Sequence, residues 1–244
     1  RKSISCYVVS RYRSIYFYDH THTHTHIHNS SGNYTNALKY LREIRESNKD
    51  MNSDPRVLMN EALSEYGVGS HLNSFRFLSK LSEITKNSGK PTYVLLYNQA
   101  LTNVHLKRFA AATSIAENLF AEAEHLSEEL SLRVCFLLLE LHFYATRGYS
   151  SKEFQESEEY EKMKKILTFL KKSSHDSKEF KFRIHLVMTK IQLRIESTKQ
   201  VKKEVKAALD LYESEIKAQL NNPPSVATSD SLRPTDSTWW CLAG

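Results

Sequence analysis

Two stretches of this sequence nearly repeat each other: Val57-Leu58-Met59-Asn60-Glu61-Ala62-Leu63-Ser64 and Leu95-Leu96-Tyr97-Asn98-Gln99-Ala100-Leu101-Thr102. They begin 38 residues apart, and four of their eight positions are identical. In both, apolar residues recur at the spacing that places them on one face of an α-helix. A helical segment repeated at a fixed offset predicts an array of similar helical units.

An aromatic residue followed three residues later by alanine occurs at Tyr34 and Ala37, and again at Phe109 and Ala112. The alanine lets two helices approach closely, and the aromatic ring fills the space between neighbouring helix pairs. This combination is typical of the second helix of a tetratricopeptide (TPR) repeat, which has a standard length of ~34 residues. An offset of 38 fits such a repeat if its loops are slightly longer. The alternative is a generic helical bundle in which these repeats are coincidental.

The sequence therefore predicts an all-α fold, a TPR-like α-solenoid of antiparallel helix pairs wound as a right-handed superhelix. Only six glycines and five prolines occur in 244 residues, which favours long helices over folds rich in turns. Ser30 or Ser31 can cap the first helix, and Asp54 with Pro55 is a strong start signal for the second. We expect about nine helices, near residues 31–44, 55–67, 72–88, 91–106, 109–123, 128–145, 157–172, 177–196 and 199–219.

The two ends of the sequence differ in composition from residues 30–220, which we interpret as the TPR-like domain. Residues 1–29 lack an initiator methionine and contain alternating histidine and threonine from His20 to His28, which indicates a low-complexity or aberrant segment. Five histidines on one face of a strand could instead bind Zn²⁺ or Ni²⁺. Residues 221–244 begin with Asn-Asn-Pro-Pro and predict a disordered tail. Its Trp239-Trp240 pair could be a docking motif, although an aberrant terminus explains it better.

Charge and cysteine content exclude several classes of protein. The net charge is +6, from 34 Lys and Arg against 28 Asp and Glu, and half of the excess lies within residues 1–29. The remainder is nearly balanced, so we expect no direct contact with nucleic acid. No run reaches the ~18 apolar residues that a membrane helix needs, so no membrane contact is expected either. Three cysteines form no disulfide framework, which fits a reducing, intracellular setting.

No residue pattern points to catalysis, to a metal or to another cofactor, so the sequence predicts a protein that is not an enzyme and has no small-molecule substrate. Cys135 lies within an apolar run, which favours a buried and inert thiol. Glu158 with Lys162, and Glu161 with Lys165, are spaced as ordinary helix-surface ion pairs. A basic patch at residues 202–206 is interpreted as a solvated helix face, with an RNA site as the alternative.

Asn60 and Asn98 occupy the same position of the repeat, two residues before the small residue. In a TPR array this position lines the concave groove, where an amide can both donate to and accept from the backbone of an extended peptide. We therefore predict partner binding at four groove or rim residues: Asn60, Tyr97, Asn98 and Lys107. The alternative is that each asparagine only satisfies a neighbouring helix.

Several stretches resemble subunit ten of the CCR-NOT deadenylase complex: residues 97–100, residues 105–109, Glu117 with Leu119, residues 134–141, and residues 32–50 in part. The resemblance covers roughly residues 31–172, with weaker support to 220. It implies a non-catalytic TPR subunit that pairs with subunit eleven and docks on the N-terminal part of the large scaffold subunit. That complex shortens poly(A) tails and represses mRNA, which implies a cytoplasmic and nuclear location. The chain departs from the family in lacking the first helix of repeat one and the downstream repeats.

Two other functions remain open. One is a chaperone-adaptor TPR domain that clamps an acidic C-terminus, although the first helix that would supply part of such a clamp is absent. The other is an RNA-binding helical repeat, which predicts strongly salt-dependent affinity for single strands. Because terminal repeats need a polar outer face, residues 30–220 alone are expected to be sticky or marginally stable.

Overall fold

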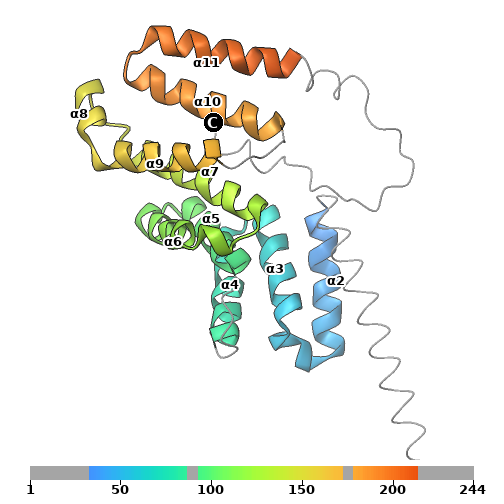
Figure 1. Ribbon diagram of the computed structural model, residues 1–244. Coiled ribbons are helices and arrows are strands. Elements are labelled where there is room, and N and C mark those ends of the chain that lie inside the picture. The colour runs from blue at the N-terminus through green and yellow to red at the C-terminus, as the bar shows by residue number, and fades with distance from the viewer. Residues whose placement is uncertain (1–32, 87–92, 173–177, 214–244) are drawn as a thin grey trace, which may run out of the picture. The chain divides into compact units, whose positions relative to one another are not determined.

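The computed structural model describes residues 33–86, 93–172 and 178–213, and within these ranges all regular structure is helical (Figure 1). The predicted low-complexity segment with its histidine-threonine run, and the predicted tail with Trp239 and Trp240, lie outside the described residues. The elements in chain order are α2 (Tyr34–Ser47), η1 (Lys49–Ser53), α3 (Pro55–Gly67), α4 (His71–Lys86), α5 (Tyr93–His105), α6 (Phe109–Ala121), η2 (Ala123–His125), α7 (Glu128–Ala145), α8 (Ser151–Glu156), α9 (Glu158–Lys172), α10 (Lys178–Arg194) and α11 (Thr198–Leu211).

Local sequence explains where several of these helices begin. The Asp54 carboxylate accepts hydrogen bonds from the backbone N–H groups of Arg56 and Val57, and Pro55 occupies the first turn of α3, as the sequence predicted. At α2 the cap is Asn33, whose side chain accepts from the Asn36 N–H; the predicted caps Ser30 and Ser31 lie outside the described residues. Residues 33–36 therefore start α2 by the same capping chemistry that the sequence placed slightly earlier.

The described residues fall into two compact units, which meet in the sequence between Arg108 and Phe109. In the first unit, α2 packs on α3, α3 on α4, and α4 on α5, each helix against the next in the chain. Burying a large aliphatic side chain stabilises a fold by roughly 2 kcal/mol, so the apolar core that these helices share holds them together. That core draws side chains from α3, α4 and α5: Leu58, Ala62, Leu78, Leu81 and Leu95.

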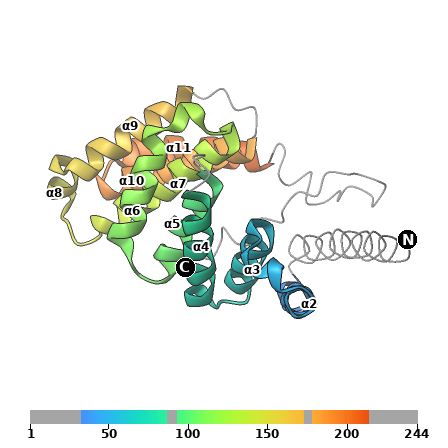
Figure 2. The ribbon, with the colours of Figure 1, turned by 90° about the horizontal axis from the view of Figure 1, so that it is seen from below.

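The second unit is organised around α7, which is apolar on nearly every side and therefore buried among α6, α9 and α10. Lys190 of α10 donates to Glu140 of α7 at 2.7 Å, and the Phe180 ring stacks on Phe136 with centroids 6.1 Å apart. Arg194, near the end of α10, donates to the carbonyl oxygens of Thr146 and Tyr149. These contacts fix α10 along α7, and α11 packs beside α10 (Figure 2).

The all-α, TPR-like arrangement of neighbouring helix pairs is confirmed, whereas the handedness of a superhelix stays a prediction. The described ranges contain ten α-helices where the sequence predicted about nine. The additional one is α8, which begins with a capping box: Ser150 caps the Glu153 N–H, and the Glu153 carboxylate accepts from the Ser150 N–H. Because Phe154 of this short helix is completely buried, tertiary packing holds a segment too short to be helical alone.

Candidate interaction surface

The two stretches that repeat in sequence also repeat in hydrogen bonding. Ser64 Oγ donates to the Asn60 carbonyl at 2.7 Å, and 38 residues later Thr102 Oγ1 donates to the Asn98 carbonyl at 2.8 Å. In both helices a hydroxyl group is therefore satisfied within its own helix, one turn back. Equivalent side chains of α3 and α5 thus make the same bond, which Ser79, Thr168 and Thr189 also make in other helices.

The next pair of equivalent residues, Glu61 and Gln99, reaches back to the preceding helix. Glu61 of α3 accepts from Arg45 Nη1 of α2 at 2.7 Å, and Gln99 Nε2 of α5 donates to the Leu78 carbonyl of α4 at 3.3 Å. This position of the repeat therefore links α3 to α2 and α5 to α4. Such a link supports the array and leaves little of the side chain for a ligand.

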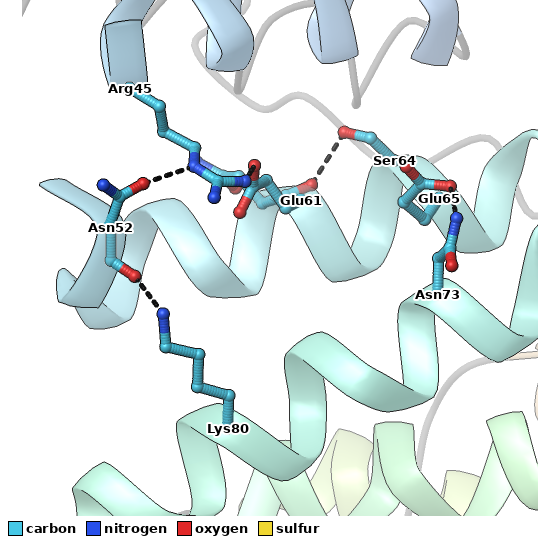
Figure 3. Close-up of polar contacts among 8 residues, drawn as sticks. Arg45, Asn52, Glu61, Ser64, Glu65, Asn73 and Lys80 are labelled. Carbon is cyan, nitrogen blue, oxygen red and sulfur yellow. Dashed lines mark hydrogen bonds and ion pairs between the residues drawn. The ribbon is translucent and has the colours of Figure 1, made fainter. Parts of the chain in front are cut away.

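Arg45 is the centre of a wider polar contact in the first unit (Figure 3). Its Nε donates to Asn52 Oδ1 at 2.6 Å, while Lys80 Nζ of α4 donates to the Asn52 carbonyl at 2.6 Å. The 3₁₀-helix η1, which contains Asn52, is thereby tied to both α2 and α4. Burial raises the pKa of Glu61, although the hydrogen bond from Arg45 and its charge lower it in part.

The four predicted groove residues lie in very different environments. Asn60 and Tyr97 are 8% and 4% exposed, so each offers little surface to a partner. Asn98 is half-buried, and its Nδ2 donates to the thioether of Met59 at 3.6 Å. Lys107 is exposed. Through this contact Asn98 of α5 lies beside Met59 of α3, the residue that precedes Asn60. Lys107, in contrast, lies beyond the end of α5.

Lys107 has a second feature that the sequence analysis missed. Its φ angle is 59°, in the left-handed region, and the residue 38 positions earlier is Gly69, with a φ of 83°. At both ends the following residue bonds back five residues, Ser70 N–H to the Glu65 carbonyl and Arg108 N–H to the Asn103 carbonyl. Lys107 is therefore the helix-terminating position of its repeat, a role that glycine fills in the preceding one.

An aromatic cluster of Tyr66, His71 and His105 also went unpredicted. The two imidazole rings stack with centroids 4.3 Å apart, and the Tyr66 ring meets both edge to face at 5.0–5.1 Å. Burial lowers the pKa of both histidines, and for His105 the neighbouring His71 adds to the effect. Neutral rings can stack in this way, so the cluster packs the ends of α3 and α5 against the start of α4.

Side chains of the second unit follow the sequence predictions more closely. Lys162 pairs with Glu158 at 3.1 Å as expected, but it also contacts Glu117 of α6 at 3.0 Å. The predicted ion pair of Glu161 with Lys165 is wrong. Glu161 pairs instead with Lys164, because residues three apart on a helix lie as close together as residues four apart. Cys135 is fully buried, and burial raises the pKa of its thiol to about 12, as expected for an inert cysteine.

Within the described ranges, no group of three or more His, Cys, Asp or Glu side chains is placed to hold a metal ion. Among the same residues, no helix combines the length and apolar character that crossing a bilayer requires.

Comparison with known proteins gives partial matches. The chain is 32% identical over 124 residues to CCR4-NOT transcription complex subunit 10-A of Xenopus laevis, a match that covers 46% of this chain and 16% of the relative. It is 31% identical over 124 residues to subunit 10-B of the same organism, with the same coverage. No family model matches the chain. The matched region is therefore related to CCR4-NOT subunit 10, of which it spans about a sixth.

Proposed function

We propose that this chain is a non-catalytic TPR-type scaffold subunit of the CCR4-NOT complex, which acts through protein–protein binding in mRNA deadenylation, mRNA turnover and translational repression. The observation that carries the proposal is the similarity to the two Xenopus laevis subunits, at 32% and 31% identity. The equivalent hydrogen bonds of α3 and α5 fit this proposal, because stacked helical repeats offer extended surfaces to protein partners.

The proposed partners are the N-terminal part of the scaffold subunit and subunit eleven, in the cytoplasm and nucleus. Contact with nucleic acid, membrane or small-molecule substrate is not part of the proposal. Among the predicted groove residues, Asn98 and Lys107 are the better candidates for direct contact. Asn98 is half-buried, and its contact with Met59 does not use the amide oxygen, which remains an acceptor of suitable chemistry.

Co-purification of the full chain with the scaffold subunit's N-terminal segment and subunit eleven tests this proposal. An acidic chaperone-tail peptide and a poly(A) oligonucleotide serve as parallel baits for the two other functions. We expect capture by the scaffold pair alone, weakened by Asn98→Ala. The matched control is Asn36→Ala, which removes an exposed amide from α2. Capture by the chaperone peptide instead supports the generic adaptor, and capture by none contradicts the proposal.

A further inference from the structure

The hairpin of α10 and α11 exposes five large apolar side chains. They are Leu186 at 43% and Leu193 at 60% on α10, Val205 at 39% and Leu209 at 53% on α11, and Tyr212 at 38%, the C-cap residue of α11. Exposed apolar residues scattered singly need no explanation, but a contiguous group marks an interaction site. We call these five residues the hairpin face.

Helical spacing groups the five residues into one stripe along each helix of the hairpin. Leu186 and Leu193 are seven residues apart, and Val205, Leu209 and Tyr212 follow one another at spacings of four and three, so each set forms a stripe on its helix. Two contacts join the helices, and the first involves Phe182, which lies one turn before Leu186 on the same face of α10. The Phe182 ring of α10 lies 6.4 Å from the Tyr212 ring, and His185 Nδ1 lies 2.7 Å from Glu204 Oε2. The two helices run antiparallel, as their ribbons show (Figures 1 and 2). Because Phe182 shares a face with Leu186, its contact with Tyr212 places the two apolar stripes next to each other.

The opposite side of α10 already has its packing partners. Ile191 is buried, and Phe180 stacks on Phe136 of α7. Lys190 lies between Leu186 and Leu193 in helical spacing, flanks their stripe and pairs with Glu140 of α7. The hairpin face is thus a separate surface, and within the described part of the second unit no helix covers it.

Charge indicates what fits this surface. Residues 180–213 contain eight Lys and Arg but only four Asp and Glu. Glu204 is buried and faces His185, and Lys190 is paired with Glu140 of α7, so both are left out of the balance and basic residues still exceed acids by four. The exposed Lys202 and Lys206 lie one turn from Val205 and Leu209, along the outer edge of the apolar stripe. An occupant therefore needs aliphatic side chains at its centre and negative charge at its edge.

We propose that the hairpin face binds an amphipathic α-helix of a partner protein, with an aliphatic stripe flanked by Asp and Glu. A helix with anchors at i, i+3 or i+4, and i+7 matches the two turns between Leu186 and Leu193. Its acidic edge would lie against Lys202 and Lys206. The aliphatic centre distinguishes this surface from a nucleic-acid site, which uses aromatic stacking and phosphate contacts. The inference concerns only the α10–α11 hairpin and holds whether or not the chain enters the CCR4-NOT complex.

Fluorescence anisotropy with the full chain tests the proposal. The probe is a fluorescein-labelled peptide of about 20 residues, long enough to form a helix, with leucines at the stated spacing and glutamates elsewhere. A second peptide replaces every glutamate with lysine, and a third scrambles the acidic sequence so that no stripe forms. We expect saturable binding of the first peptide only.

Two double variants locate the binding on the hairpin face. Leu186→Ser with Leu209→Ser removes apolar area, and Lys202→Glu with Lys206→Glu reverses the edge charge. Each is expected to raise Kd at least about tenfold. Their matched controls, Leu72→Ser with Val94→Ser and Lys39→Glu with Lys86→Glu, alter equally exposed residues of the first unit and should leave Kd within about twofold.

Three results overturn the proposal. One is a failure of specificity: the lysine or scrambled peptide binds as tightly as the acidic peptide, or the control variants weaken binding as much as the hairpin-face variants do. Another is recruitment of the chain to vesicles of phosphatidylcholine and phosphatidylserine through these residues without peptide binding, which assigns the face to a membrane. The last is a dimer in light scattering that the Leu186→Ser and Leu209→Ser variant dissociates and that does not bind the peptide, which assigns the face to a second copy.

Discussion

The α3–α4 hairpin and the α10–α11 hairpin are built from helices of similar length but use their side chains differently. The first buries Asn60, Glu61 and Ser64 among its apolar residues and shares its core with α5. In the second, α10 has a single fully buried apolar residue, Ile191, while its leucines are exposed. The comparison teaches that the same helical spacing of apolar residues can either pack one helix against the next or leave an apolar surface exposed.

The sharpest way to break this comparison is to truncate one leucine in each hairpin. Leu58 of α3 is buried, so Leu58→Ala should cost about 2–5 kcal/mol of unfolding free energy through lost burial and a cavity. Leu193→Ala on α10 should change it by less than about 0.5 kcal/mol. Urea unfolding followed by circular dichroism measures both. A large loss for Leu193→Ala would mean that the hairpin face is buried in solution.

Removing the partner of a buried acid has the next largest effect. The Glu61 side chain is 4% exposed and that of Arg45 is 36% exposed. Arg45→Met should cost about 2–3 kcal/mol at pH 7, less than a fully buried pair because Arg45 is partly solvated. Arg42→Met, on the exposed side of α2, is the control and should be nearly neutral.

The same pair predicts a pH dependence. Burial raises the pKa of Glu61 above its usual value of 4.5, so the folded state holds this proton more tightly than the unfolded state does. Stability from this group is therefore lost as pH rises from 4.5 through the folded pKa. Without Arg45 that pKa rises further, so the deficit of Arg45→Met relative to the native chain should be larger at pH 7 than at pH 4. An equal deficit at both pH values would assign the loss to packing.

Replacing a closely packed glycine should cause a smaller loss of unfolding free energy. A Cβ added at Gly67, the last residue of α3, would lie 2.3 Å from Cγ of Tyr34. Gly67→Ala should therefore destabilise the first unit by about 1–3 kcal/mol. Gly148, between α7 and α8, has no heavy atom within 4 Å of an added Cβ, so Gly148→Ala should be nearly neutral. Thermal unfolding of the two variants compares them, and recovery by Tyr34→Ala would identify the clash.

The smallest change in stability is expected at helix ends, where the two units behave alike. Lys107 after α5 and Glu196 after α10 both have φ near 60°. Replacing either with glycine should stabilise the chain by about 1 kcal/mol, because glycine adopts this conformation without strain. Gly69→Ala should do the opposite. Loss of stability in Lys107→Gly, measured by denaturant midpoint, would show that its side chain contributes more than its backbone strain costs.

Much of the first unit could be predicted from local sequence. Asp54 and Pro55 mark the start of α3, and the 38-residue offset identified residues that prove equivalent in hydrogen bonding. The short helix α8 was missed although Ser150 and Glu153 carry its capping signal, because only the burial of Phe154 makes so short a helix stable.

The predicted groove shows where sequence reasoning ends. Tyr97 and Asn98 are neighbours on α5, yet Tyr97 is buried and Asn98 half-buried, because successive residues point about 100° apart and the packing of α4 and α3 decides which one is covered. The stacking of His71 on His105 depends likewise on how three helix ends meet. The role of Asn60, Tyr97, Asn98 and Lys107 in partner binding stays a prediction.

The contact of Arg194 with the Thr146 and Tyr149 carbonyls has a consequence for proteolysis. A protease must draw its substrate backbone into an extended strand, and exposed connections between helices are its usual targets. Here the guanidinium group holds two carbonyls of the α7–α8 connection, and Arg147 lies over the Tyr144 ring at 4.3 Å. The trypsin site after Arg147 is therefore protected by a residue far away in the sequence, and its cleavage reports the release of α10 from α7.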